Sequence, residues 1–123
     1  MQLSHHAMLV NDMDKAIEIY CGLLGLRLLR RIKGAAYKEV AHLEDATNGR
    51  RIELLLDENA PQTQFDHLGF EVEDVDKAFA ELSGQGFTTE REPFDVAGGK
   101  VRTSFLRSPD GIRIELIRYA TPT

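Results

Sequence analysis

The chain has little of several features that would assign it to a specialised class of protein. Its single cysteine, Cys21, cannot form an internal disulfide. No apolar run approaches the roughly 18 residues of a transmembrane helix, and the first residues lack a basic and then apolar leader pattern. The net charge of −5 argues against a nucleic-acid surface, which needs surplus lysine and arginine. We therefore expect a cytoplasmic protein that binds neither nucleic acid nor membranes and acts on a small molecule.

The composition that remains is that of an ordinary globular protein. Of its 123 residues, 42% are hydrophobic and 28% are charged, which is enough apolar material for a buried core. This length falls within the usual range for one domain. We predict a single domain over residues 1–123.

Internal repetition is the strongest pattern in the chain. The stretch around His5 returns around His67, and the stretch around Glu53 returns around Glu115, with the same offset of 62 residues in both cases. Similarity at a fixed spacing indicates repeated structural units. We predict a first module over about 1–57, a linker over 58–65 and a second module over about 66–119.

The first module has the signals of a strand, a helix and three further strands. A strand over 3–10 is followed by Asn11-Asp12, which is typical of a helix start, and Gly25 ends the helix. The helix would bury a stripe made of Met13, Ala16, Ile17, Tyr20, Leu23 and Leu24. The remaining strands are expected at 26–32, 37–43 and 51–57, with a tight hairpin turn at Asn48-Gly49.

The second module repeats this order. A strand over 66–72 precedes a helix that begins at Asp74, and strands follow near 87–94, 101–107 and 112–119. The chain therefore has an α+β pattern of two tandem βαβββ modules. We expect curved mixed sheets around a concave site.

Strand alternation decides which repeated residues share a face. In the first strand His5 lies on the face opposite His6, so His6 is expected to be a core or interface residue. In the fourth strand Glu53 lies opposite Ile52 and Leu54, which would face the helix. The four repeated residues would then line the faces away from the helices: His5, Glu53, His67 and Glu115.

Two imidazoles and two carboxylates suit a divalent transition metal such as nickel, cobalt, manganese or zinc. One metal ion per site is the expected cofactor. Duplicated modules can also inherit duplicated surface residues that bind nothing, and this alternative stays open.

The succession of motifs LGL, RIEL, DHLGFEVED and SPDGIRIELI resembles the vicinal oxygen chelate superfamily, and most of all its glyoxalase I branch, lactoylglutathione lyase. The resemblance covers residues 3–119. It implies the same four metal ligands, His5, Glu53, His67 and Glu115. It also implies a homodimer, often with each site completed by two chains.

The activity implied by this resemblance is a carbon–sulfur lyase reaction. The hemithioacetal of an α-oxoaldehyde such as methylglyoxal would be converted to a 2-hydroxyacyl thioester through a metal-stabilised enediolate. Glu53 and Glu115 would remove and return the proton. Family practice favours Glu115 as the principal base.

Departures from the family pattern bear on the thiol. Glutathione-using members carry an arginine and an asparagine where this chain has Leu9 and Asp57. The apolar side chain of Leu9 and the anionic side chain of Asp57 cannot bind the carboxylates of glutathione as an arginine and an asparagine do. Another thiol would fit these substrate-binding positions better. Similar loops close over ligands in the family, so Gly98, Gly99 and Lys100 are further candidate substrate contacts.

Two alternatives to the lyase remain. A methylmalonyl-CoA epimerase-like enzyme uses related proton abstraction, and a metal-free drug-binding protein shares the scaffold. Of the other polar and reactive residues, His42 is expected on a strand surface and Cys21 as an inert buried thiol. The basic cluster Arg27, Arg30, Arg31 and Lys33 is expected on a solvated face, with attraction of an anionic substrate as its alternative.

Overall fold

A computed structural model describes residues 1–119 of the chain. These residues form two compact units. The N-terminal unit is His5–Asp66, and the C-terminal unit combines Met1–Ser4 with the chain from His67 onward. The single domain over 1–123 stays a prediction, and its last four positions lie outside the described residues.

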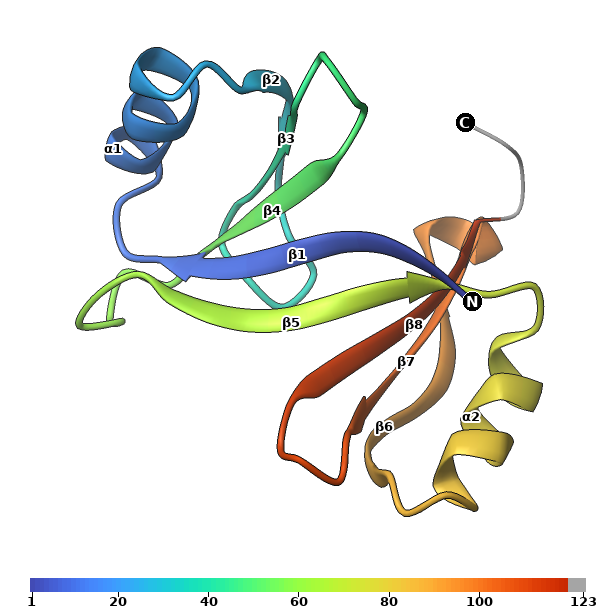
Figure 1. Cartoon of the computed structure of the whole chain (residues 1–123). Helices are drawn as coiled ribbons and strands as arrows, with labels where there is room; N and C mark the ends of the chain where they lie inside the picture. Colours follow the sequence, from blue (N-terminus) through green and yellow to red (C-terminus); the bar gives the residue numbers. More distant parts are fainter. Residues whose placement is uncertain (120–123) are drawn as a thin grey trace. The chain divides into compact units, whose positions relative to one another are not determined.

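The N-terminal unit has the expected βαβββ order (Figure 1). Its sheet runs β2-β3-β4-β1, with β1 and β4 parallel and the other neighbours antiparallel. The elements are β1 (Gln2–Val10), α1 (Met13–Ile17), the π-helical segment η1 (Glu18–Leu23), β2 (Arg27–Ile32), β3 (Val40–Glu44) and β4 (Arg51–Leu56).

The C-terminal unit repeats this arrangement with the sheet order β5-β8-β7-β6. Its parallel pair is β5 and β8, which match β1 and β4. The elements are β5 (Gln64–Glu71), α2 (Val75–Ser83), β6 (Thr88–Val96), the 3-10 turn η2 (Ala97–Gly99), β7 (Val101–Arg107) and β8 (Arg113–Tyr119). The predicted α+β class with mixed sheets is confirmed.

Matching aspartates begin the two helices. The side chain of Asp12 accepts a hydrogen bond from the backbone N–H of Lys15 at 3.1 Å, and that of Asp74 accepts one from Lys77 at 3.0 Å. Each carboxylate satisfies an N–H group that has no partner within the helix. Both helix starts are where the sequence predicts them.

The end of the first helix differs from the predicted stripe. Met13 and Ala16 are buried against the sheet, but Leu23 and Leu24 are exposed, so their placement in the stripe was wrong. The backbone N–H of Leu24 bonds to the carbonyl of Ile19, five residues back. This wider π-type turn rotates later side chains away from the face that a regular α-helix would bury.

Strand alternation separates two apolar layers in the N-terminal unit, as predicted. Leu54 belongs to an apolar cluster with the α1 residues Met13 and Ala16, and Ile52 and Leu56 pack against this cluster. Leu55 packs on the opposite face with Ala7. The face with Leu55 is also the face of Glu53, because residues two apart in a strand share a side.

Two further predictions need correction. His6 is exposed on β1, so it is not a core residue of this chain. The turn between β3 and β4 is wider than a tight hairpin and covers residues 45–50. The Asp45 carboxylate builds it by accepting from the Thr47 backbone N–H at 2.9 Å and from the Asn48 amide at 3.2 Å.

Candidate metal centre

The N-terminal unit holds one buried imidazole against a carboxylate. His5 on β1 and Glu53 on β4 come from the parallel pair, where Ala7 is the Cα partner of Glu53. His5 Nε2 lies 3.1 Å from Glu53 Oε2. His5 is only 2% exposed, so its ring is enclosed by the fold.

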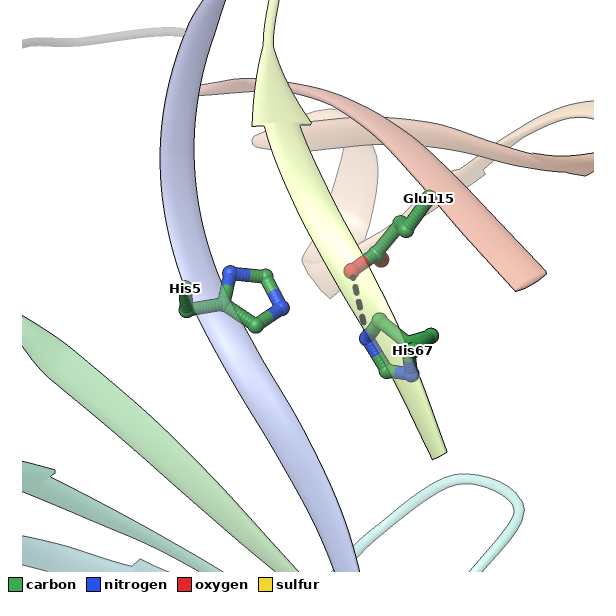
Figure 2. Close-up of side chains that lie close together, drawn as sticks. All are labelled: His5, His67 and Glu115. Carbon is green, nitrogen blue, oxygen red and sulfur yellow. Dashed lines mark ion pairs between the residues drawn. The ribbon is translucent and has the colours of Figure 1, made fainter. Parts of the chain in front are cut away.

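The C-terminal unit builds the same pair from β5 and β8. His67 Nε2 lies 3.2 Å from Glu115 Oε1, the ion pair that Figure 2 marks with a dashed line. Gly69 is the Cα partner of Glu115, as Ala7 is of Glu53. The repeat is therefore preserved in strand register as well as in sequence.

Glu115 has a hydroxyl partner that has no counterpart at the matching position beside Glu53. Thr103 Oγ1 on β7 donates a buried hydrogen bond to Glu115 Oε2 at 2.8 Å. Thr103 is the cross-strand partner of Ile117. In the N-terminal unit Leu55 corresponds to Ile117, and its partner is Val40, which has no hydroxyl. The Glu115 side chain is also less exposed than that of Glu53, at 12% against 22%.

Cross-strand neighbours distinguish the two glutamates further. Phe105 is the partner of Glu115 and meets the His67 ring edge-on, with centroids 5.7 Å apart. The matching partner of Glu53 is His42, whose Nε2 lies 4.0 Å from Glu53 Oε2. His42 is thus part of the N-terminal site and not the plain strand-surface residue that its sequence position indicated.

The surroundings of His42 lower its pKa to about 4. Burial is the largest cause, and electrostatic interactions with Arg30, His5 and Arg51 add to it. Charged imidazolium is disfavoured in such a place. His42 is therefore a neutral ring at physiological pH.

The donors fit a divalent transition metal. Each unit presents an imidazole nitrogen and a carboxylate oxygen about one hydrogen bond apart, in a buried or half-buried setting. Among the described residues, His5, His67 and Glu115 are buried donors of the kind that could hold a metal ion. Mixed imidazole and carboxylate sets suit zinc, nickel, cobalt and manganese.

The predicted substrate-binding residues have different surroundings. Leu9 lies in the apolar cluster with Ala7 and Leu55, and the Asp57 carboxylate accepts the backbone N–H of Asn59 at 3.0 Å. The loop with Gly98, Gly99 and Lys100 is exposed, and both glycines have positive φ angles that favour glycine. Their role toward a substrate stays a prediction.

Three residues of the basic cluster lie on β2 and contact side chains of their own unit. Arg27 pairs with Glu44, and Arg31 bonds to Glu39 and Asp14. These partners raise the pKa of Arg31. Arg27 and Arg31 are therefore in exposed ion pairs, while Arg30 contacts His42.

Cys21 is half-buried rather than fully enclosed, and burial raises the pKa of its thiol. A raised pKa keeps the less reactive protonated form. No helix of residues 1–119 combines the length and apolar character needed to cross a membrane.

Two βαβββ units, each with a buried histidine paired to a glutamate, define an α+β protein built from two repeated modules. A family profile described as Glyoxalase/Bleomycin resistance protein/Dioxygenase superfamily matches residues 2–116. The chain belongs to this superfamily.

Curated relatives cover nearly the whole chain. It is 33% identical to lactoylglutathione lyase of Haemophilus influenzae, over 95% of this chain and 92% of that protein. It is 32% identical to a probable lactoylglutathione lyase of Vibrio cholerae, over 95% and 90% of the two chains.

Solved structures share the fold. A hypothetical protein of Bacillus halodurans superposes with a TM-score of 0.83 at 23% identity, over 99% of this chain and 96% of that one. Methylmalonyl-CoA epimerase of Mycobacterium tuberculosis superposes with a TM-score of 0.80 at 25% identity, over 98% and 89%.

Proposed function

We propose that the protein is a metal-dependent glyoxalase I-like lyase. It would convert the hemithioacetal of an α-oxoaldehyde to a 2-hydroxyacyl thioester. The observation that carries this proposal is the pair of His–Glu contacts in matching register, each made by a buried histidine. Relatives with lactoylglutathione lyase names, at 33% and 32% identity over most of the chain, support it.

The proposed ligands are His5, Glu53, His67 and Glu115, with one divalent nickel, cobalt, manganese or zinc ion per site. When bound, the ion would supply Lewis-acid stabilisation of the negative charge that develops on the substrate oxygens. The imidazoles would hold the ion. One glutamate, as the carboxylate, would take the proton from one substrate carbon, and the other, as the carboxylic acid, would give a proton to the neighbouring carbon; transfer of the first proton to the second glutamate would restore both.

The roles of the glutamates differ in this proposal because their settings differ. Family resemblance assigns Glu115 as the principal base, while the hydrogen bond from Thr103 favours a fixed orientation for its carboxylate. Glu115→Gln keeps one oxygen for the metal and removes the proton acceptor. We expect turnover to fall by at least about 100-fold with Co²⁺ still bound. Unchanged turnover would contradict the base role.

One assay tests the proposed activity directly. Protein reconstituted with nickel, cobalt, manganese or zinc is given methylglyoxal with glutathione and with other thiols, and thioester formation is followed. Leu9 and Asp57 replace the arginine and asparagine of the glutathione pattern, so we expect faster turnover with a thiol other than glutathione. No turnover with any α-oxoaldehyde adduct would overturn the lyase proposal.

A methylmalonyl-CoA epimerase-like activity is the second candidate. The superposition on the Mycobacterium tuberculosis epimerase, with a TM-score of 0.80, favours it. If this candidate were right, methylmalonyl-CoA given to the same reconstituted protein in D₂O would incorporate deuterium. A metal-free binding protein is the third candidate, and negligible uptake of all four metals would support it.

We also propose a cytoplasmic homodimer, as the family resemblance implies. Sedimentation velocity should show twice the mass of the chain. Mixing His5→Ala with His67→Ala chains decides how the ligands are divided. Sites shared between two chains would regain about a quarter of the activity by random pairing, while sites closed within one chain would regain none.

A further inference from the structure

His42 stands beside Glu53 at a position where the C-terminal unit has a phenylalanine. The antiparallel pairing of β3 with β4 makes His42 the cross-strand partner of Glu53, as Phe105 is of Glu115. The Nε2 atom of His42 is 4.0 Å from Glu53 Oε2. That oxygen is also the one that faces His5 Nε2 at 3.1 Å.

Arg30 determines which nitrogen of this ring carries the proton. Its Nη1 lies 2.7 Å from His42 Nδ1, and the two residues are Cα partners across β2 and β3. A guanidinium only donates hydrogen bonds, so Nδ1 must accept. In the neutral ring the proton then lies on Nε2, the nitrogen that faces Glu53.

The 4.0 Å contact is electrostatic and too long for a hydrogen bond. A bound metal would change what surrounds Glu53 Oε2. An imidazole nitrogen that ligates a metal has no proton to donate, so His5 Nε2 could no longer act as a donor to this oxygen. His42 is the second ring in the same unit directed at that oxygen.

We propose that His42 is a positioning residue for Glu53. With the metal bound, its Nε2–H would come within hydrogen-bond distance of the Glu53 carboxylate, 4.0 Å away in this structure, and would hold that carboxylate in its ligand orientation, while Arg30 keeps the required tautomer. The inference rests on the proposed function, because it takes Glu53 as a metal ligand. Partners that orient ligands in this way change metal affinity by about 10- to 100-fold.

The test measures metal affinity rather than turnover. Co²⁺ is titrated into metal-free full-length protein, with a competing chelator and the visible spectrum as readouts. We expect His42→Phe, which copies the residue at the matching position, to weaken Co²⁺ binding by about tenfold and to change the spectrum. His42→Gln keeps an N–H donor and should restore most of the affinity.

The chain offers a matched control. His6→Phe makes the same substitution at an exposed position of β1 and should leave Co²⁺ affinity unchanged. Arg30→Met removes the group that sets the tautomer and keeps the His42 ring, at an exposed side chain, and should weaken binding less than His42→Phe. If His42→Phe fails to fold, Arg30→Met carries the test.

The outcomes separate the inference from the proposed function. Wild-type protein that binds Co²⁺ with an affinity unaltered by His42→Phe and Arg30→Met overturns the role of His42 and leaves the lyase proposal standing. Wild-type protein that binds none of the four metals overturns the proposed function itself. A merely structural His42 would lower the free energy of unfolding without moving the cobalt spectrum.

Discussion

At the residue scale, Thr103 distinguishes two glutamates that the repeat makes equivalent. Its hydroxyl donates to Glu115 Oε2 at 2.8 Å in a buried setting, whereas Val40 occupies the matching position near Glu53. Hydrogen bonds to charged groups contribute more than neutral ones, and a buried carboxylate that loses its donor is costly. The contribution of the Thr103 hydroxyl should therefore be measurable in the free energy of unfolding.

Thr103→Val should lower the free energy of unfolding by about 1.5–3 kcal/mol, since the shape is kept and only the donor to a buried anion is lost. Urea unfolding of metal-free protein measures this. Thr103→Ser keeps the hydroxyl and is the control, expected to stay much closer to wild type. A loss in Thr103→Ser with Thr103→Val unchanged would mean that the methyl group, and not the hydrogen bond, stabilises the site.

The sequence alone identified His5, Glu53, His67 and Glu115 by their common spacing, and the structure pairs them within each unit. The prediction from sequence missed His42, because the predicted tight turn at Asn48-Gly49 would have placed Glu44 opposite Glu53. The wider turn around Asp45 shifts the register and brings His42 there instead. Turn length sets hairpin register, and a side-chain-capped loop is hard to recognise from sequence.

At the element scale, Glu90 joins three strands of the C-terminal unit. From β6 it accepts hydrogen bonds from Arg107 on β7 at 2.8 Å and from Arg113 on β8 at 3.0 Å. Burial alone would raise the pKa of Glu90, but the two arginines outweigh it and lower the pKa below the ordinary 4.5. The carboxylate form is thus favoured by the folded state.

Glu90→Gln should lower the free energy of unfolding at pH 7 by about 1 kcal/mol, a small value because the side chain is partly exposed. A depressed folded-state pKa means that the contribution is complete above the ordinary pKa and is lost as pH falls through the folded value. The difference from wild type should therefore shrink below pH 4.5.

Urea unfolding at pH 7 and at several acidic pH values measures this difference. Glu92→Gln is the control, since Glu92 is an exposed carboxylate on the same strand. A difference for Glu90→Gln that stays constant down to acidic pH would show that the two arginine contacts do not depend on its charge.

The elements themselves were largely predictable, because Asp12, Asp74 and Gly25 are strong local signals for the ends of helices. The exposed Leu23 and Leu24 were not, since a π-type turn changes the period on which the apolar stripe was predicted. Local signals fix where an element begins. They do not fix its hydrogen-bond pattern, which depends on how the sheet packs against it.

At the scale of the whole molecule, the proposed function assigns ligands from both units to one metal ion, and such an ion would couple the stabilities of the two units. A ligand that binds only the folded state stabilises by about 2.7 kcal/mol at 100 times its dissociation constant. Metal-loaded wild-type protein should gain this much over protein held in chelator. Urea unfolding with buffered free Co²⁺ provides the measurement.

His5→Ala and His67→Ala change one ligand in each unit, and each should abolish most of the Co²⁺-dependent gain while leaving the metal-free stability only modestly lower. His6→Ala changes an exposed neighbour and should keep the full gain. If one unit bound the metal by itself, the variant in the other unit would retain the gain. The paired loss is therefore the result that the proposed ligand set predicts.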